Sequence, residues 1–181
     1  MNLRIAKNES AALRITNGGD IEFSEKERDL MRKVLILGIG NLLRSDDGLG
    51  VHIIRYIEEA GAVLPDGIEL LDGGTAGFDL MGLIENYDKI VIVDALKAND
   101  APGSIYRFTP DHAVETRSRF SLHEVGIMEV IRLLRLMNHK PEIEFVGIVP
   151  ENISDFDINI SPAVRESIPR AVEVILDAAT H

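Results

Sequence analysis

The sequence predicts an α/β fold: a single three-layer domain with a mostly parallel central sheet and helices on both faces. Two observations lead to this prediction. Apolar runs without alternation, at residues 34–37 and 89–94, are typical of strands that are covered on both faces. Segments with apolar residues at three- and four-residue steps separate such runs. The resulting order of strand, helix, strand, helix, strand favours right-handed crossovers between parallel strands.

The first strand and the segment after it organise the rest of the chain. The apolar run 34–37 leads into Gly38-Ile39-Gly40, which predicts a buried strand that breaks into a loop at its carboxyl end. Beyond the paired acids Asp46 and Asp47, apolar residues at helical spacing and a C-cap glycine, Gly61, predict an amphipathic helix. Both carboxylates are therefore expected where open α/β sheets bind their ligands.

The remaining elements are predicted in chain order. The pattern predicts strands at 68–72, 89–94, 104–108 and 142–149, and helices at 78–87, from Ser121 to before Asn138, and from Ser161 to Ala179. Pro169 is expected to kink or split the last helix. Asp94 then falls at the carboxyl end of its strand, on the same edge of the sheet as Asp47.

Residues 1–30 differ in pattern from the rest of the chain. Residues 13–16 and 21–23 suit a small hairpin around a glycine turn, but no apolar pattern ties them to a core. The segment also lacks the long apolar region of a secretory signal. Two interpretations stay open: residues 1–30 are a mobile or dispensable extension before a domain at 31–181, or they are an integral part of the fold.

Composition excludes several classes of protein. A formal net charge of −11 argues against a nucleic-acid partner, which needs clustered Lys and Arg. No apolar run approaches the roughly 20 residues that span a bilayer, so no membrane insertion is expected. Cysteine is absent, which excludes a disulfide framework and a cysteine nucleophile and is compatible with a cytoplasmic location.

The glycines of the first loop raise the alternative of a nucleotide site. The third glycine of a dinucleotide fingerprint would fall at position 43, which is Leu43. The acids Asp46 and Asp47 would also repel a pyrophosphate. A nucleotide-binding α/β protein is therefore the weaker interpretation. The motifs of serine hydrolases of the nucleophile-elbow type, zinc peptidases and phosphate-loop enzymes are absent as well.

Asp47, Asp94 and His123 are the candidate metal ligands. Singly, each has an ordinary explanation. Asp47 would complement a helix dipole, Asp94 would cap the turn after its strand, and His123 would be a solvated residue in the first turn of a helix. Together, two carboxylates and an imidazole form a site for nickel, zinc or cobalt, which these ligand types alone do not distinguish. His52 is the poorer partner for Asp47, because it lies on another face of the helix. Asp46 is expected to point elsewhere, so that its replacement by Asn should have little effect.

Five motifs occur in order along the chain. They are Gly38-Ile39-Gly40-Asn41-Leu42-Leu43-Arg44-Ser45-Asp46-Asp47-Gly48-Leu49-Gly50, Asp72-Gly73-Gly74-Thr75-Ala76-Gly77, Ile92-Val93-Asp94-Ala95, Ser121-Leu122-His123-Glu124 and Gly147-Ile148-Val149-Pro150-Glu151. In this order the motifs resemble those of a known family, the nickel-iron hydrogenase maturation endopeptidases. The resemblance extends over residues 31–179 and leaves residues 1–30 outside.

The resemblance implies a peptidase that removes a C-terminal extension from the precursor of a hydrogenase large subunit after nickel insertion. The family's ligands carry over to Asp47, Asp94 and His123, where the first acid is Asp although some relatives have Glu. No further catalytic residue is implied. Nickel would come with the precursor, and zinc or cadmium could occupy the same site. The alternative is a nickel-binding assembly factor without peptidase activity.

Two further expectations concern recognition and assembly. The Asp72-Gly73-Gly74 turn resembles the family motif connected with substrate recognition, but Asp72 would equally serve to cap the turn through Gly73 and Gly74. Both roles stay open. The protein is expected to be a cytoplasmic monomer.

Overall fold

The structure is a computed structural model that describes residues 14–15, 21–22, 32–110 and 122–181. The chain divides into two compact units, Met1–Arg32 and Lys33–His181. In the first unit, β1 (Arg14–Ile15) pairs antiparallel with β2 (Ile21–Glu22), as the hairpin prediction requires. The second unit contains every other described element, and the candidate site lies in it.

A five-stranded sheet forms the centre of the second unit, with the strand order β4-β3-β5-β7-β6. Parallel pairing joins β4, β3, β5 and β7, and β6 runs antiparallel to β7 at the edge. The mostly parallel sheet confirms the predicted fold class. The strands are β3 (Val34–Ile39), β4 (Ile68–Gly74), β5 (Lys89–Ala95), β6 (Ile105–Phe108) and β7 (Glu142–Ile148).

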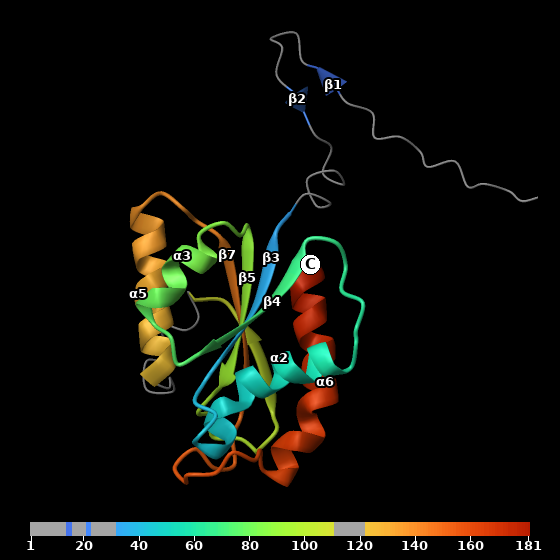
Figure 1. The fold of residues 1–181 in the computed structure, drawn as a ribbon, viewed down its shortest axis with the longest axis vertical. Coiled ribbons are helices and arrows are strands. Elements are labelled where there is room, and N and C mark those ends of the chain that lie inside the picture. The colour runs from blue at the N-terminus through green and yellow to red at the C-terminus, as the bar shows by residue number, and fades with distance from the viewer. Residues whose placement is uncertain (1–13, 16–20, 23–31, 111–121) are drawn as a thin grey trace, which may run out of the picture. The chain divides into compact units, whose positions relative to one another are not determined.

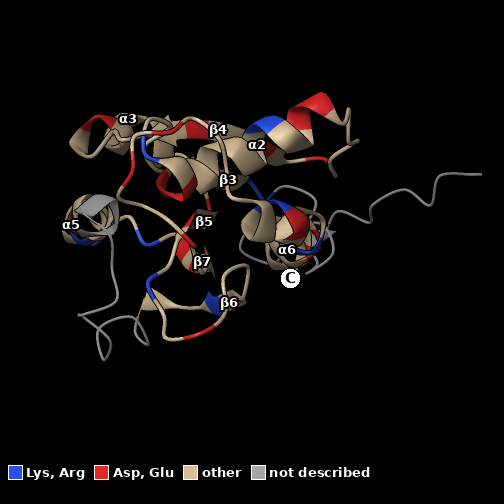
Figure 2. Ribbon diagram, turned by 90° about the horizontal axis from the view of Figure 1, so that it is seen from below, with Lys and Arg blue, Asp and Glu red and all other residues tan. Residues whose placement is uncertain are grey.

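Helices cover both faces of this sheet (Figures 1 and 2). On one face lie α2 (Leu49–Glu59) and α6 (Pro162–Thr180), and on the other lie α3 (Met81–Ile84) and α5 (Leu122–Leu136). Seen from below in Figure 2, the strands pass between these two helical layers in the order of the sheet. Among the described residues, no helix combines the length and the apolar character needed to cross a bilayer.

Successive side chains of the buried strands point to opposite faces of the sheet, which divides the apolar core into two layers. Val34 and Ile36 of β3 pack with α2 and α6, while Leu35 and Leu37 pack with α3 and α5. Successive side chains of a strand point to opposite faces, so a strand covered on both faces needs apolar residues at every position. This requirement explains why β3 and β5 appear in the sequence as continuous apolar runs.

Two predicted helices differ from the observed ones. The helix expected at 78–87 is instead a 3₁₀ turn, η2 (Phe78–Leu80), followed by α3, which ends at Ile84. Pro169 does not split the last helix, because α6 runs without interruption from Pro162 to Thr180. The proline ring lies on the solvent-exposed side of α6, where water can satisfy the carbonyl that lost its amide partner.

An ion network lies near the amino ends of β5 and β7, away from the loop edge that carries the candidate site. The Lys89 side chain is fully buried, with its Nζ 2.7 Å from an oxygen of Glu142 and 3.6 Å from one of Glu144. Arg107 of β6 contacts Glu144 at 2.6 Å and Asp177 of α6 at 2.7 Å. The buried Lys89 ammonium is thus paired with carboxylates of β7, as a buried charge requires. Arg107 links the edge strand β6 to β7 and to α6.

A chain that begins at Met31 is expected to fold with the same thermal midpoint as the whole protein. The second unit contains both layers of the apolar core that the described residues form, so removing residues 1–30 takes away none of these core side chains. Circular dichroism melts of the two chains measure this. A shortened chain that fails to fold would show that the extension is integral.

Candidate active site

The loop after β3 folds back over the end of that strand. Gly40 has φ +136°, and a Cβ at this position would lie 1.9 Å from the carbonyl oxygen of Asp47. The Asn41 amide donates to the same oxygen at 3.2 Å, and the Asp47 amide donates to the Arg44 carbonyl at 3.0 Å. The close approach therefore requires glycine at position 40. It fixes the short 3₁₀ helix η1 (Ser45–Gly48), which carries Asp46 and Asp47.

Asp47 and Asp94 lie at the same edge of the sheet. β3 and β5 are parallel neighbours with Gly38 beside Val93, so both strands end there, and η1 contacts β5. Asp47 is 6% exposed and Asp94 is 2% exposed. The Asp94 Oδ1 atom accepts a hydrogen bond from the Ala95 amide at 2.7 Å. Buried carboxylates need hydrogen bonds, a countercharge or a metal, and their oxygens suit a divalent ion.

His123 lies in the first turn of α5, as predicted, and its side chain is outside the described residues. The described side chains contain no group of three His, Cys, Asp or Glu residues arranged to hold a metal. The expected convergence of all three ligands therefore stays a prediction, while the two carboxylates occupy the edge that the sequence assigned to them.

The Asp72-Gly73-Gly74 segment lies beside this loop and forms the end of β4, which extends two residues beyond the predicted strand 68–72. The Gly40 amide donates to the Gly74 carbonyl at 2.8 Å, which ties the end of β4 to the end of β3. Asp72 Oδ1 accepts the Gly74 amide at 3.1 Å, and Oδ2 contacts Arg55 at 3.0 Å. Asp72 therefore holds the backbone at Gly74, as its structural role predicts, but Gly73 and Gly74 are the end of β4 and not a separate turn. Its 38% exposed side chain leaves the role in substrate recognition open as a proposal.

Asp46 has a structural task that sequence reasoning missed. Its side chain is fully buried, and its carboxylate accepts four hydrogen bonds from a distant loop. The donors are the Glu151 and Asn152 amides, each at 2.9 Å, and the Ser161 amide and hydroxyl at 2.8 and 2.9 Å. The Asp46 carboxylate points toward residues 151–161, so it points elsewhere than the candidate metal site, as expected. The expectation that its replacement by Asn should have little effect is not supported by this geometry, because every donor faces a carboxylate oxygen.

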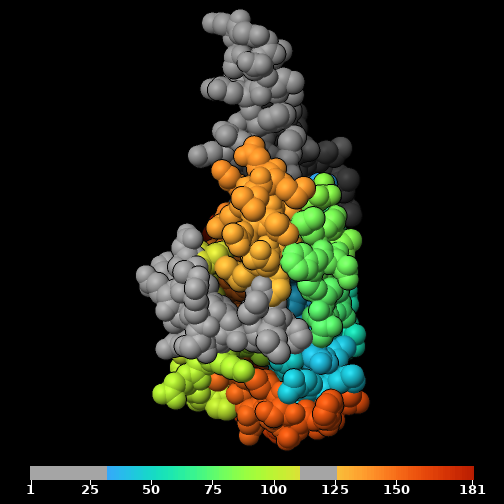
Figure 3. Space-filling view, turned by 90° about the vertical axis from the view of Figure 1, so that its left-hand side faces the viewer, coloured from blue at the N-terminus to red at the C-terminus, as the bar shows by residue number. Residues whose placement is uncertain are grey.

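Ser45 joins the same two segments through further contacts. Its amide donates to the Asp157 carbonyl at 2.6 Å, and its hydroxyl donates to the Asn159 carbonyl at 3.1 Å. Arg44 and Asp157 form a parallel bridge. The loop at 151–161 is thus attached to η1 along its length, and both segments appear side by side at the lower end of the molecule (Figures 1 and 3).

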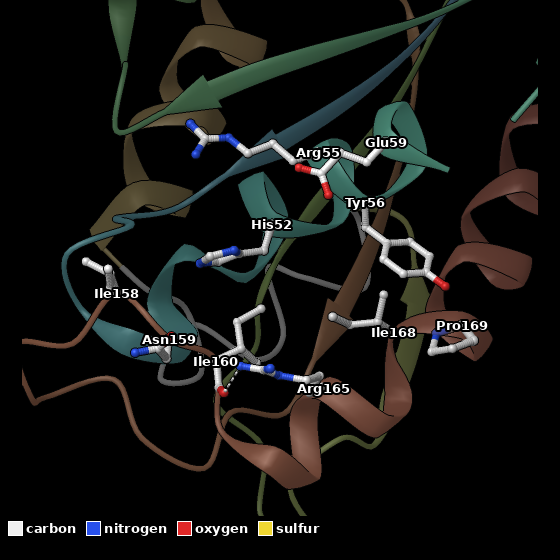
Figure 4. Close-up of a pocket in the computed structure, with 10 residues that line it drawn as sticks. All are labelled: His52, Arg55, Tyr56, Glu59, Ile158, Asn159, Ile160, Arg165, Ile168 and Pro169. Atoms are coloured by element: carbon white, nitrogen blue, oxygen red, sulfur yellow. Dashed lines mark hydrogen bonds between the residues drawn. The ribbon is translucent and has the colours of Figure 1, made fainter. Parts of the chain in front are cut away.

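A pocket of about 490 Å³ lies between α2, this loop and α6 (Figure 4). His52 of α2 and Arg165 of α6 line it, and an Arg165 nitrogen donates to the Ile160 carbonyl at 3.3 Å. Burial lowers the pKa of His52, and the charges of Arg55 and Arg165 lower it further. His52 thus faces this pocket, which agrees with its exclusion as the partner of Asp47.

The glycines of the first loop have a packing role. A Cβ on Gly38 would lie 2.3 Å from the Gly50 carbonyl oxygen, so this glycine lets α2 approach the strand. Gly40 is needed for the fold of η1, because of its close approach to Asp47. The protein's own backbone therefore accounts for both glycines. The Gly38-Ile39-Gly40 pattern, which suggested a nucleotide site, is thus explained without a nucleotide.

The Gly40→Ala variant tests this loop. It is expected to lose at least about 2 kcal/mol of stability, because the methyl group would overlap the Asp47 carbonyl and the φ angle is unfavourable for alanine. Urea unfolding measures the change. Gly82→Ala is the matched control, since a Cβ there meets nothing within 4 Å and its helical position favours alanine. Equal stability of the two variants would contradict the description of the loop.

Comparison with known proteins gives a consistent result. The hydrogenase maturation protease family matches residues 51–178. The hydrogenase 2 maturation protease of Escherichia coli K12 is 37% identical over 150 residues, covering 81% of this chain and 90% of that protein. The hydrogenase expression/formation protein HoxM of Azotobacter vinelandii is 34% identical over 147 residues, covering 80% of this chain and 70% of that protein.

Solved structures agree. The hydrogenase maturating endopeptidase HybD of E. coli superposes with a TM-score of 0.72 at 34% identity, covering 81% of this chain and 91% of that chain. The [NiFe] hydrogenase maturation protease HybD of Thermococcus kodakarensis gives 0.70 at 30% identity, covering 81% and 99%. The relatives from E. coli and T. kodakarensis are proteases or endopeptidases by name, which disfavours an assembly factor without peptidase activity. The chain therefore belongs to the hydrogenase maturation protease family and is a peptidase.

Proposed function

We propose that this protein is a metal-dependent endopeptidase that removes the C-terminal extension from the nickel-loaded precursor of a nickel-iron hydrogenase large subunit. The observation that carries the proposal is the pair of buried carboxylates, Asp47 and Asp94, at the carboxyl ends of adjacent strands in a member of this peptidase family. The proposal places this processing in the cytoplasm, with which a chain without cysteine is compatible, and assigns it to a monomer.

Nickel belongs to the precursor in this proposal. Asp47, Asp94 and His123 supply two oxygens and one nitrogen to it, a donor set that suits nickel, zinc or cadmium. A metal so held can polarise the scissile carbonyl or a water molecule. Binding then depends on ligands from both proteins, so the enzyme would distinguish the loaded precursor from the empty one. The Asp72-Gly73-Gly74 segment at the end of β4, hydrogen-bonded to the metal-site loop through Gly40, would contribute to selecting the precursor.

The direct test mixes the purified protein with nickel-loaded and nickel-free precursor of the hydrogenase encoded in the same genome. Mass spectrometry of the large subunit is the readout. Loss of the C-terminal extension from the loaded precursor alone is the expected result. Equal processing of both forms would contradict nickel recognition, and processing of neither would contradict the proposed substrate.

A further inference from the structure

Three large apolar side chains near the candidate site are exposed to solvent. Leu43 is 60% exposed, Phe156 is 89% exposed and Ile158 is 65% exposed. We call these three residues the loop-tip surface. Exposed apolar groups cost free energy in water, and a cluster of them marks an interaction site more often than scattered ones do.

The backbone brings the two halves of the loop-tip surface together. The bridge between Arg44 and Asp157 makes Leu43 and Phe156, the residues that precede them, neighbours across the two segments. The contacts of Ser45 with the carbonyls of Asp157 and Asn159 continue the pairing beyond Ile158. In the space-filling view the two segments form adjoining surfaces at the lower end of the molecule (Figure 3).

The loop that carries Phe156 and Ile158 is held in one conformation. Asp46 binds it at both ends, through the Glu151 and Asn152 amides and through Ser161. Within the loop, Asn152 Oδ1 accepts the Ser154 and Asp155 amides at 3.0 and 3.3 Å. A surface fixed before binding loses less entropy when a partner docks. The same turn holds Asp47, so a partner bound here lies beside the candidate metal site.

The charges around the loop-tip surface indicate its partner. Asp155 and Asp157 lie in the same loop, and neighbouring groups keep the pKa of Asp157 low, chiefly the Asn159 amide and its side chain. A second copy of this chain would bring like charges together, and the chain carries a net charge of −11. The loop side of the surface, with Asp155 and Asp157 on either side of Phe156, therefore suits a different protein that places Lys or Arg beside an apolar recess. Arg44 and Arg165 lie at the other side of the surface.

Protruding tips fit a recess in a folded partner better than they fit a flexible peptide, which binds in a groove or along a strand edge. We propose that the loop-tip surface docks the folded body of the hydrogenase large-subunit precursor, and so brings its cleavage region to Asp47 and Asp94. This inference rests on the proposed function. Ile158 also lines the 490 Å³ pocket, so the docking surface continues into a cavity beside Arg165 (Figure 4).

The test compares Phe156→Ser and Ile158→Ser, singly and together, with Val63→Ser in the full-length protein. Val63 is 97% exposed and lies after α2, outside the loop-tip surface. Each loop-tip variant should raise KM and the Kd for nickel-loaded precursor about tenfold. Its kcat should stay within about twofold, and its thermal midpoint and zinc affinity should be unchanged. Val63→Ser should match the wild type in every measurement.

Three outcomes would overturn the inference. The first is a double variant with wild-type KM and Kd, in a protein that processes the precursor normally. The second is a synthetic peptide of the C-terminal extension that fully displaces the bound precursor. Such a result would show that the loop-tip surface binds the peptide and not the folded body of the precursor. The third is a wild-type protein that does not bind the precursor. A wild type that binds but does not cleave would contradict only the proposed function, and loss of binding in the double variant would then still support docking.

Discussion

The Asp46→Asn variant is expected to lose about 3 kcal/mol of stability, a large fraction of what a domain of this size has. Asp46 is fully buried and accepts four hydrogen bonds through both carboxylate oxygens. An amide group in either orientation points N–H donors at the Ser161 amide or at the Glu151 and Asn152 amides, and buried groups without partners are costly. Urea unfolding gives the loss, and hydrogen exchange should show faster exchange in residues 151–161.

Asp155→Asn is the matched control. It removes the same charge from the same loop, but at an exposed side chain whose contact with the Asn152 side chain, at 2.7 Å, an amide can partly retain. A change within about 0.5 kcal/mol is expected. Equal stability of the two variants would show that the buried network does not hold the loop.

Replacement of the candidate ligands is expected to abolish function without unfolding the protein. Asp47→Asn, Asp94→Asn and His123→Ala should each weaken zinc binding and precursor processing at least about 100-fold, because each removes one bond to the ion. An amide at position 94 keeps the acceptor for the Ala95 amide, so the thermal midpoint should move little. Isothermal titration with zinc and the processing assay measure the two effects separately.

Asp79→Asn is the control for charge alone, since Asp79 is exposed in η2. It should bind zinc and process precursor as the wild type does. Normal processing by all three ligand variants would contradict the metal mechanism. The processing rate of an Asp46 variant does not show whether Asp46 or Asp47 binds the metal, because that variant also loosens the loop at 151–161. Zinc affinity of the folded protein is the measurement that separates them.

The strands and the edge of the sheet used for binding could be predicted because they depend on local patterns. Continuous apolar runs identified β3 and β5, and the parallel order of these strands is enough to put Asp47 and Asp94 at one edge. The short α3 was harder. Apolar residues at helical spacing extended to Tyr87, but the chain turns toward β5 after Ile84, and Tyr87 bonds Glu69 of β4 instead.

The role of Asp46 could not be predicted, because its partners lie more than 100 residues away. Two adjacent aspartates look alike in sequence, and only the fold shows that one is a ligand candidate while the other holds a loop. The Ser161-Pro162 helix start was recognised, yet nothing local indicated that the Ser161 hydroxyl binds Asp46. The loop-tip surface was missed for the same reason, since it exists only where residues 43–45 and 156–159 pair.

The central claim is that Asp47, Asp94 and His123 hold one ion. A crystal structure of the protein soaked with zinc or cadmium, with anomalous diffraction to identify the metal, tests it most directly. The account predicts a single strong peak bonded to one oxygen of each aspartate and to one imidazole nitrogen, at about 2.0 to 2.2 Å for zinc. A peak bound elsewhere on the chain, with Asp47 and Asp94 left without metal, would contradict it.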